Sequence, residues 1–224
     1  MMLSKHSDLD VVCICTPNGS HSDIAVDVLN SEKHVVIEKP IGLSKAKCES
    51  VIYKALQKHK QVFAVMQNRY SPPSVWLKDI VNKVIGDIFM VQVNCYWNRD
   101  DRYYKKGGWK GTKDLDGGTL FTQFSHFIDI MYWLFGDITN IQGKFNDFTH
   151  QKSTDFEDSG FVSFDFNEGG MGCLNYSTAI WGTNLESSMT IIGSKGSVKV
   201  GGQYMNEIEY CNIEDYTMPE LSPS

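Results

Sequence analysis

The sequence has 224 residues, of which 42% are hydrophobic and 21% are charged, with a formal net charge of −6 at pH 7. This length suits one large domain or two small ones, and the composition is typical of a globular protein. An acidic chain without a basic run argues against a nucleic-acid partner, and no run of about 18 apolar residues is present to span a membrane.

The first 70 residues alternate buried strands and amphipathic helices. The apolar run 10–15 predicts a strand buried on both faces, and Ser20 is placed to cap a helix that reaches about Asn30. Runs at 34–37 and 61–66 predict two more strands, separated by a helix from Ser44 to about residue 60. Strands that alternate with helices pair in parallel, so we expect part of a Rossmann-type α/β sheet.

After Gly86 the pattern changes to long strands. Pro72 and Pro73 open a linking helix, residues 88–97 predict a strand, 98–118 a polar loop, and 119–135 one long helix closed by Gly136. Further strands are expected at about 138–146, 160–166, 172–179, 188–192, 197–200 and 207–211. We therefore expect an α+β domain at 71–224 with a large, mainly antiparallel open sheet, after an α/β domain at 1–70.

Polar side chains follow all three strands of the expected parallel sheet. Ligands bind beyond the carboxyl ends of such strands, so three polar ends together favour a binding site. A solvated sheet edge is the alternative interpretation. The three ends are Thr16-Pro17-Asn18, Glu38-Lys39-Pro40 and Gln67-Asn68-Arg69.

Lys39 is the most suggestive of these residues. Partial desolvation at the rim of a cleft lowers the pKa of a lysine, which can then bind a substrate hydroxyl and help its proton leave. Glu38 can orient this lysine or contact a cofactor, and Pro40 can fix the backbone through a cis bond. An ordinary charged pair at a strand exit explains the same spacing equally well.

His126 lies in the helix expected at 119–135. Helical spacing puts Thr122 and His126 on one face, together with Asp129 or Ile130. A neutral imidazole at this place can accept a hydroxyl proton, although a buried histidine with satisfied hydrogen bonds is the simpler interpretation.

The loop before that helix contains a cation beside an aromatic ring. Trp109 and Lys110 can bind a carboxylate or a phosphate, and the alternative is a surface loop that packs Trp109 against the sheet. The six cysteines form no C-x-x-C pair and no His/Cys cluster shows ligand spacing, so we expect a reduced, cytoplasmic chain without a metal.

Several segments resemble the glucose–fructose oxidoreductase/inositol dehydrogenase (Gfo/Idh/MocA) family. They are DVVCICTPNGSH, HVVIEKPIGLS, the strand end at 66–70, GGTLFTQFSHFIDIMYWLFG and IIGSKGSVKV. The resemblance implies a dinucleotide-binding domain followed by a substrate-binding and oligomerisation domain. It implies that Lys39 contacts substrate and nicotinamide and that His126 serves as base or substrate ligand. It implies cofactor contacts, with NAD favoured over NADP, for Thr16, Pro17, Asn18, His21, Glu38, Lys39 and Gln67.

Within that family, QNRYSPPSVWLKDIV and GGWKG are similar to the UDP-N-acetylglucosaminuronate 3-dehydrogenases. This similarity implies oxidation of the 3-hydroxyl of a UDP-linked N-acetyl-hexosaminuronate during polysaccharide biosynthesis. Many members of the family carry Asp four residues before the histidine, whereas this chain has Thr122. The substrate side of the site would comprise Lys39, Asn68, Arg69, Trp109, Lys110, Thr122 and His126.

The glycine-rich G-x-G-x-x-G turn that grips a dinucleotide pyrophosphate is absent from the 224 residues. We therefore expect an N-terminally truncated chain. The alternatives are a catalytically incomplete fragment that acts as a structural or oligomerisation module, and a dehydrogenase of free sugars or inositols. A homo-oligomer, a dimer or tetramer formed through the open sheet, is the expected assembly.

Overall fold

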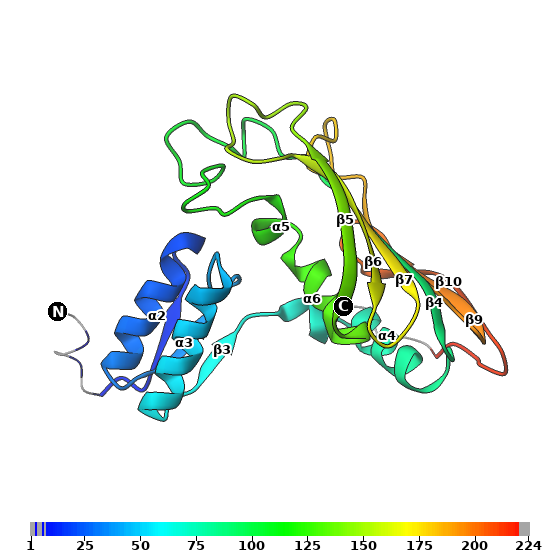
Figure 1. Ribbon diagram of the computed structural model, residues 1–224, viewed down its shortest axis with the longest axis horizontal. Helices are drawn as coiled ribbons and strands as arrows, with labels where there is room; N and C mark the ends of the chain where they lie inside the picture. Colours follow the sequence, from blue (N-terminus) through cyan, green and yellow to red (C-terminus); the bar gives the residue numbers. More distant parts are fainter. Residues whose placement is uncertain (1–2, 4–5, 7, 220–224) are drawn as a thin grey trace. The chain divides into compact units, whose positions relative to one another are not determined.

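The computed structural model describes Leu3, His6 and residues 8–219, and the chain divides into two compact units (Figure 1). Unit 1 contains the chain up to Met66 together with Lys105–Ser125 and Thr154–Phe156. Unit 2 contains Gln67–Tyr104, His126–Ser153 and the chain from Glu157 onward. The loop at 105–125 therefore groups with the N-terminal strands. The expected domain boundary at residue 70 stays a prediction.

Unit 1 is built on a three-stranded parallel sheet, as its alternating pattern predicts. The order is β1 (Val11–Ile14), β2 (His34–Ile37) and β3 (Val62–Ala64), joined by α2 (His21–Asn30) and α3 (Lys45–Lys58). Parallel pairing places the carboxyl ends of β1 and β2 at the same edge, where the amide of Glu38 donates to the carbonyl oxygen of Ile14 at 3.0 Å.

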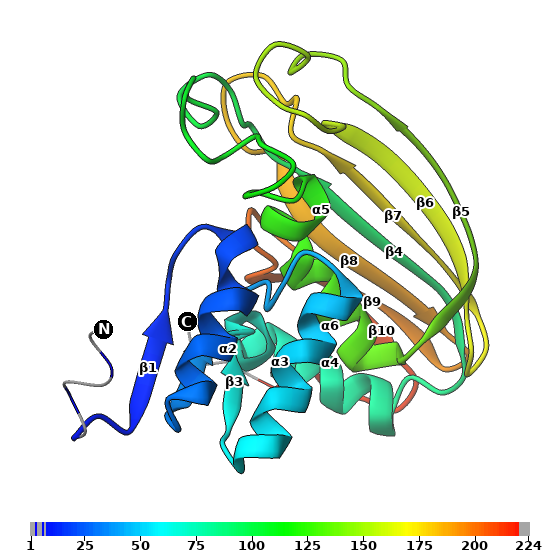
Figure 2. The same ribbon diagram turned by 60° about the vertical axis from the view of Figure 1, so that its left-hand side comes forward.

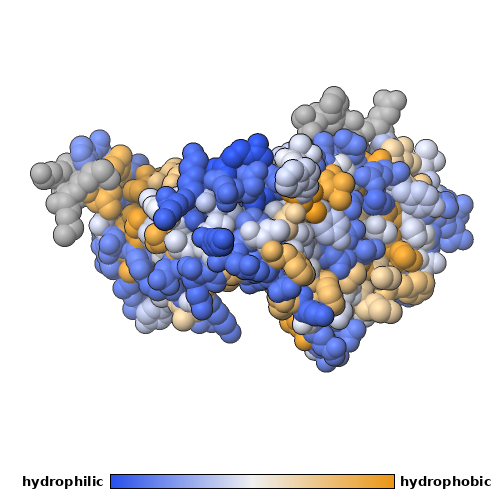
Figure 3. All heavy atoms as spheres, turned by 90° about the horizontal axis from the view of Figure 1, so that it is seen from above, coloured by the Kyte–Doolittle hydropathy of each residue, from blue (hydrophilic) through white to orange (hydrophobic). Residues whose placement is uncertain are grey.

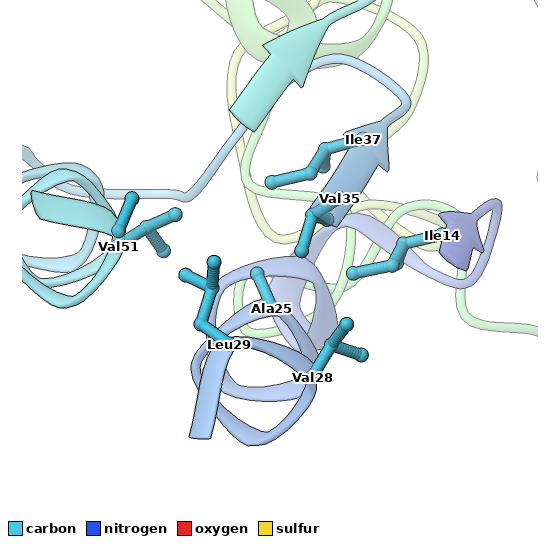
Figure 4. Close-up of a cluster of buried hydrophobic side chains, with 8 residues drawn as sticks. Ile14, Ala25, Val28, Leu29, Val35, Ile37 and Val51 are labelled. Atoms are coloured by element: carbon cyan, nitrogen blue, oxygen red, sulfur yellow. The ribbon is translucent and has the colours of Figure 1, made fainter. Parts of the chain in front are cut away.

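One face of this sheet packs against the helices and forms the core of unit 1 (Figure 4). The opposite face leaves Val11 and Phe63 about half exposed, and Cys13 is exposed as well. The expectation that β1 is buried on both faces is therefore wrong for the described chain, because the helices of unit 1 cover one face only. The core consists of Ile14, Ala25, Val28, Leu29, Val35, Ile37, Val51 and Ala55.

Unit 2 contains a seven-stranded sheet in the order β10-β9-β8-β4-β7-β6-β5 (Figure 2). All neighbouring strands are antiparallel except β4 and β7, which run parallel, so the expected mainly antiparallel sheet is confirmed. The strands are β4 (Ile88–Tyr96), β5 (Ile138–Asn146), β6 (Ser159–Phe166), β7 (Met171–Ser177), β8 (Glu186–Gly193), β9 (Gly196–Gly201) and β10 (Glu207–Ile213).

Helices α4 (Pro72–Lys83) and α6 (Ser125–Phe135) lie on one side of this sheet (Figures 1 and 2). The ring of Phe135 at the end of α6 lies 5.1 Å from that of Phe166 on β6. On β4, Val91 and Val93 are fully buried whereas Met90 is exposed, as the alternation of a strand with one covered face requires.

Hydrophobic and hydrophilic side chains are mixed over the molecular face in Figure 3.

Local signals at helix ends succeed in some places and fail in others. Ser71 caps α4 by accepting from the Ser74 amide, and Gly136 ends α6 with a φ of 76°. Ser20 does not cap α2 through its side chain, because it belongs to η1 and has helical backbone angles, with φ −91° and ψ −12°. Its hydroxyl donates to the Pro17 carbonyl oxygen at 2.7 Å.

The single helix expected at 119–135 is two helices. The first is the short α5 (Thr119–Thr122), the second is α6, and the chain between them turns at Gln123 and Phe124. The structure also contains two 3-10 turns, η1 (Asn18–Ser20) and η2 (Gln67–Tyr70). Among the described residues, no helix has the length and apolar character that a membrane crossing needs.

Candidate active site

Lys39 is the second residue after β2, and its half-buried ammonium is held inside unit 1. Nζ donates a hydrogen bond to the main-chain oxygen of Thr122 at the end of α5. Burial lowers the pKa of Lys39, and the negative charges of Glu38 and Asp116 oppose that shift. The peptide bond from Lys39 to Pro40 is cis, as the sequence suggested. The amine therefore has a fixed direction and a reduced affinity for its proton.

Glu38 turns back toward the chain. Its Oε2 accepts from the Lys39 amide at 3.3 Å, so the carboxylate contacts the backbone that carries the lysine. Thr16 at the end of β1 is exposed, and Pro17 and Glu38 are half-buried. These are the polar strand ends that the sequence assigned to a cofactor, and their cofactor contacts stay a prediction.

Asn18 and Asp116 form the buried polar centre of unit 1. Asn18 Nδ2 donates to the Asp116 main-chain oxygen at 2.9 Å and to Thr122 Oγ1 at 2.8 Å. The Thr122 hydroxyl donates in turn to Asp116 Oδ1, and the Gly111 amide donates to Asp116 Oδ2 at 2.7 Å. Two chain segments almost 100 residues apart in sequence thus share one network beneath Lys39.

The sequence analysis gave Asp116 no role, so its place in the site was missed. Its side chain is 1% exposed. Burial raises the pKa of Asp116, whereas hydrogen bonds from Thr122 and Gly111 and the charges of Lys110 and Lys39 work in the opposite direction. The available signal was the D-G-G triplet immediately before the helix that contains Thr122.

His21 links the chain segments that follow β1 and β2. Its ring is 1% exposed, with Nδ1 2.8 Å from the Pro40 carbonyl oxygen and Nε2 2.7 Å from the Thr16 carbonyl oxygen. Both ring nitrogens thus contact main-chain oxygens of the strand ends that flank Lys39. The geometry gives His21 a part in shaping this edge, and direct contact with a cofactor stays a prediction.

Two further predicted residues come together within unit 2. Gln67 Nε2 lies 3.3 Å from His126 Nε2, and the histidine is 8% exposed. If the Gln67 amide donates, that ring nitrogen is the acceptor and the ring proton is on Nδ1.

Arg69 forms an ion pair with Asp129, which the sequence analysis did not predict. Its Nε donates to Asp129 Oδ2 at 2.7 Å, and Nη2 donates to Oδ1. The hydrogen-bonded Asp129 raises the pKa of Arg69. The guanidinium lies 5.8 Å from the Trp133 ring. This pair uses two of the five N–H donors of the guanidinium, so the others are compatible with an anionic ligand.

The contacts of Trp109, Lys110 and Asn68, the remaining predicted substrate residues, do not indicate a particular ligand. Lys110 Nζ lies 5.9 Å from the Trp109 ring, and both side chains are half-buried in unit 1. Asn68 is half-buried in η2, where its main-chain oxygen accepts from Ser71. Their roles in substrate binding stay predictions.

A separate polar cluster in unit 2 brings together Asp147, His150 and Asp158, with ligand atoms within 4.8 Å of one another. Asp158 accepts from the amides of Phe148 and Thr149, and Asp147 accepts from the amide of His150. These carboxylates therefore serve as acceptors for the backbone of the turn.

Comparison with known families gives the class of protein first. Residues 1–66 match the model described as "Oxidoreductase family, NAD-binding Rossmann fold", and residues 77–199 match the "GFO/IDH/MocA C-terminal domain". The chain belongs to the Gfo/Idh/MocA family of oxidoreductases, as its resemblance implied.

Individual relatives place the chain more closely. It is 30% identical to the WlbA dehydrogenase from Bordetella pertussis, solved in complex with NADH and UDP-GlcNAcA, with a TM-score of 0.91 over 97% of this chain and 62% of that one. The corresponding Chromobacterium violaceum complex gives 34% identity, a TM-score of 0.90, and coverage of 96% and 62%.

A curated relative carries a different activity in its name. The 2,7-anhydro-N-acetylneuraminate hydratase of Escherichia coli is 27% identical over 87% of this chain and 52% of its own length. The chain thus spans between half and two thirds of these relatives.

Proposed function

We propose that this chain forms part of an NAD-dependent dehydrogenase that oxidises a sugar hydroxyl, with Lys39 as the residue that manages the hydroxyl proton. The observation that carries the proposal is the half-buried Lys39 ammonium at the carboxyl end of β2, whose pKa is lowered by burial. An amine with a reduced pKa gives up its proton more readily than an exposed lysine does.

The residues of unit 1 fit a nicotinamide cofactor. Polar groups stand at the carboxyl ends of parallel strands, with Thr16 exposed and Glu38 half-buried beside Lys39. A bound nicotinamide supplies the acceptor for the hydride that leaves the sugar carbon. Asn18 and His21 would hold the strand ends in place, Thr16, Pro17 and Glu38 would line the cofactor, and Lys39 would contact both cofactor and sugar. Gln67, which belongs to unit 2, is a further residue that we propose to contact the cofactor.

For His126 we propose the second role in proton handling. Its Nε2, the nitrogen that faces the Gln67 amide, would accept the hydroxyl proton or hold the hydroxyl in place. A neutral imidazole in a mostly buried position is suited to this role because it can accept a proton without prior loss of one.

The substrate we propose is a UDP-linked N-acetyl-hexosaminuronate, oxidised at its 3-hydroxyl. Two relatives with 30% and 34% identity were solved with UDP-GlcNAcA and NADH, which supports this choice. Arg69 and Lys110 offer cations for the anionic groups, Asn68 an amide and Trp109 an aromatic surface. Thr122 would contribute through the network that holds Lys39.

The test is oxidation of UDP-GlcNAcA followed by NADH absorbance, with free glucose and myo-inositol as competing substrates. We expect Lys39→Ala to lower kcat/KM for the UDP-sugar by about 100-fold or more. The matched control is Lys45→Ala, because the side chain of Lys45 is 88% exposed. Equal turnover in both variants would refute the role of Lys39. Preference for inositol or glucose would refute the substrate, and a folded chain that binds no NADH would favour a structural module.

The open face of the unit 2 sheet is our proposed homo-oligomer surface. Strand register aligns Met90 with Met171 on one side and with Ile192 on the other, and these side chains are 37%, 59% and 39% exposed. A row of exposed apolar side chains across three strands is typical of a contact surface. Met171→Lys should lower the mass measured by light scattering, whereas Glu168→Lys in the neighbouring turn should not; an unchanged mass in both variants would contradict the proposal.

A further inference from the structure

Three segments of unit 1 meet at Thr122, the last residue of α5. Lys39, which follows β2, donates to the Thr122 main-chain oxygen. Asn18 from η1 donates to the Thr122 hydroxyl at 2.8 Å, and that hydroxyl donates to Asp116. The main-chain oxygen that anchors the lysine thus belongs to a residue whose side chain is held by a buried carboxylate.

Asp116 accepts hydrogen bonds through both carboxyl oxygens, as a carboxylate does. The Thr122 hydroxyl donates to Oδ1 and the Gly111 amide donates to Oδ2. The Asn18 amide donates to the Thr122 oxygen, and the Asp116 main-chain oxygen, 3.0 Å away, is a second acceptor for the Thr122 hydroxyl. A carboxyl group that is 1% exposed therefore lies in the same network as the Lys39 ammonium.

We propose that Asp116 is a positioning residue for Lys39: its carboxylate fixes Thr122, and through the Thr122 carbonyl it fixes the direction and charge of the Lys39 ammonium. This role rests on the proposed function of Lys39 in oxidation of the sugar hydroxyl. Asp116 itself touches neither substrate nor cofactor in this proposal.

The charges around Lys39 give the sign of the effect. Burial lowers the pKa of Lys39, while Glu38 and Asp116 raise it. Asp116 faces Lys110 and Lys39 as its charged neighbours. Removal of the Asp116 charge leaves burial opposed by Glu38 alone, so the pKa of Lys39 falls further. A merely structural brace of the 111–118 loop would leave that pKa unchanged as long as the protein folds.

Asp116→Asn is the informative variant because it keeps the shape of the side chain. Its amide oxygen can accept from Gly111 while its NH2 group donates to the Thr122 hydroxyl, which can accept as well as donate. Thr122→Val is the second variant and guards against a failure of the first to fold. This variant removes the Thr122 hydroxyl, so Asp116 loses a hydrogen bond that favours its charged form.

The experiment is competitive acylation of the whole chain at a series of pH values, with the labelled lysines quantified by mass spectrometry. It reports the pKa of Lys39 without turnover, and the exposed Lys45 serves as internal control in every sample. We expect Asp116→Asn to lower the pKa of Lys39, Thr122→Val to lower it by less, and Thr122→Ser to leave it at the wild-type value.

An unchanged Lys39 pKa in the folded Asp116→Asn and Thr122→Val variants would overturn the proposal. Because the measurement needs no substrate, its result is separate from that of the proposed function. A shifted Lys39 pKa in a chain that oxidises no sugar would support the positioning role of Asp116 and refute the dehydrogenase activity.

Discussion

The Arg69–Asp129 pair offers a quantitative test of whether Arg69 stabilises unit 2, in addition to its proposed role in binding a ligand. The side chains are 31% and 12% exposed, and the pair makes two hydrogen bonds between ionised groups. Exposed pairs typically contribute 1 kcal/mol or less, whereas removal of one partner of a fully buried pair costs about 3–5 kcal/mol. This pair lies between those limits.

A double-mutant cycle of Arg69→Ala and Asp129→Ala should therefore give a coupling energy of about 1–2 kcal/mol. A single variant that loses about 1–2 kcal/mol should melt roughly 2–8 °C lower, given about 2–4 °C per kcal/mol for a chain of this size. The assay is urea unfolding followed by tryptophan fluorescence, with thermal melting as a second measurement.

The control cycle uses the Lys83–Asp79 pair of α4, whose side chains are 67% and 63% exposed. An exposed pair at this helical spacing should couple by about 0.3–0.5 kcal/mol. If the coupling of Arg69 with Asp129 does not exceed that of the control, then Arg69 has no structural role in unit 2 and its stabilising function is refuted.

Three further predictions concern stability. Ser71→Ala should cost about 1 kcal/mol in urea unfolding because it removes the side-chain cap of α4, and no loss would contradict the cap. Burial raises the pKa of Asp158, but hydrogen bonds from its neighbours outweigh burial and lower it. The stabilisation by Asp158 is therefore present above about pH 4 and is lost as the pH falls through the folded pKa. Asp158→Asn should flatten the acid limb of a pH–stability curve, and an unaltered limb would contradict this. Gly172→Ala should destabilise by about 1–3 kcal/mol because a Cβ atom would lie 2.3 Å from the Phe164 ring, and a neutral effect would show that the ring moves aside.

The architecture was largely predictable because it follows from local features of the sequence, namely the spacing of apolar residues and the positions of turn residues. Strand β5 has the predicted bounds, 138–146, since turn residues limit it on both sides. The break between α5 and α6 was not predictable: residues 119–135 have one continuous helical pattern, and the turn at Gln123 and Phe124 has no glycine or proline to announce it. Contacts of Thr122 with distant segments accompany that break.

The candidate site was predictable in part for the same reason. Lys39 and Thr16 stand at strand ends, which a sequence pattern can locate. Asp116 is joined to the first strand end by Asn18, almost 100 residues away, and a single sequence contains no sign of that contact. The capping role assigned to Ser20 failed because Ser20 is the last residue of η1 and has helical rather than extended backbone angles.

The most direct measurement of the central claim is the rate of UDP-GlcNAcA oxidation by Lys39→Arg. Arginine keeps the positive charge and the N–H donors but cannot release its proton under working conditions. If Lys39 manages the hydroxyl proton, kcat/KM should fall by about 100-fold or more while NADH binding remains. A variant that retains the wild-type rate within a few-fold would show that Lys39 serves only as a fixed cation, and would contradict the account.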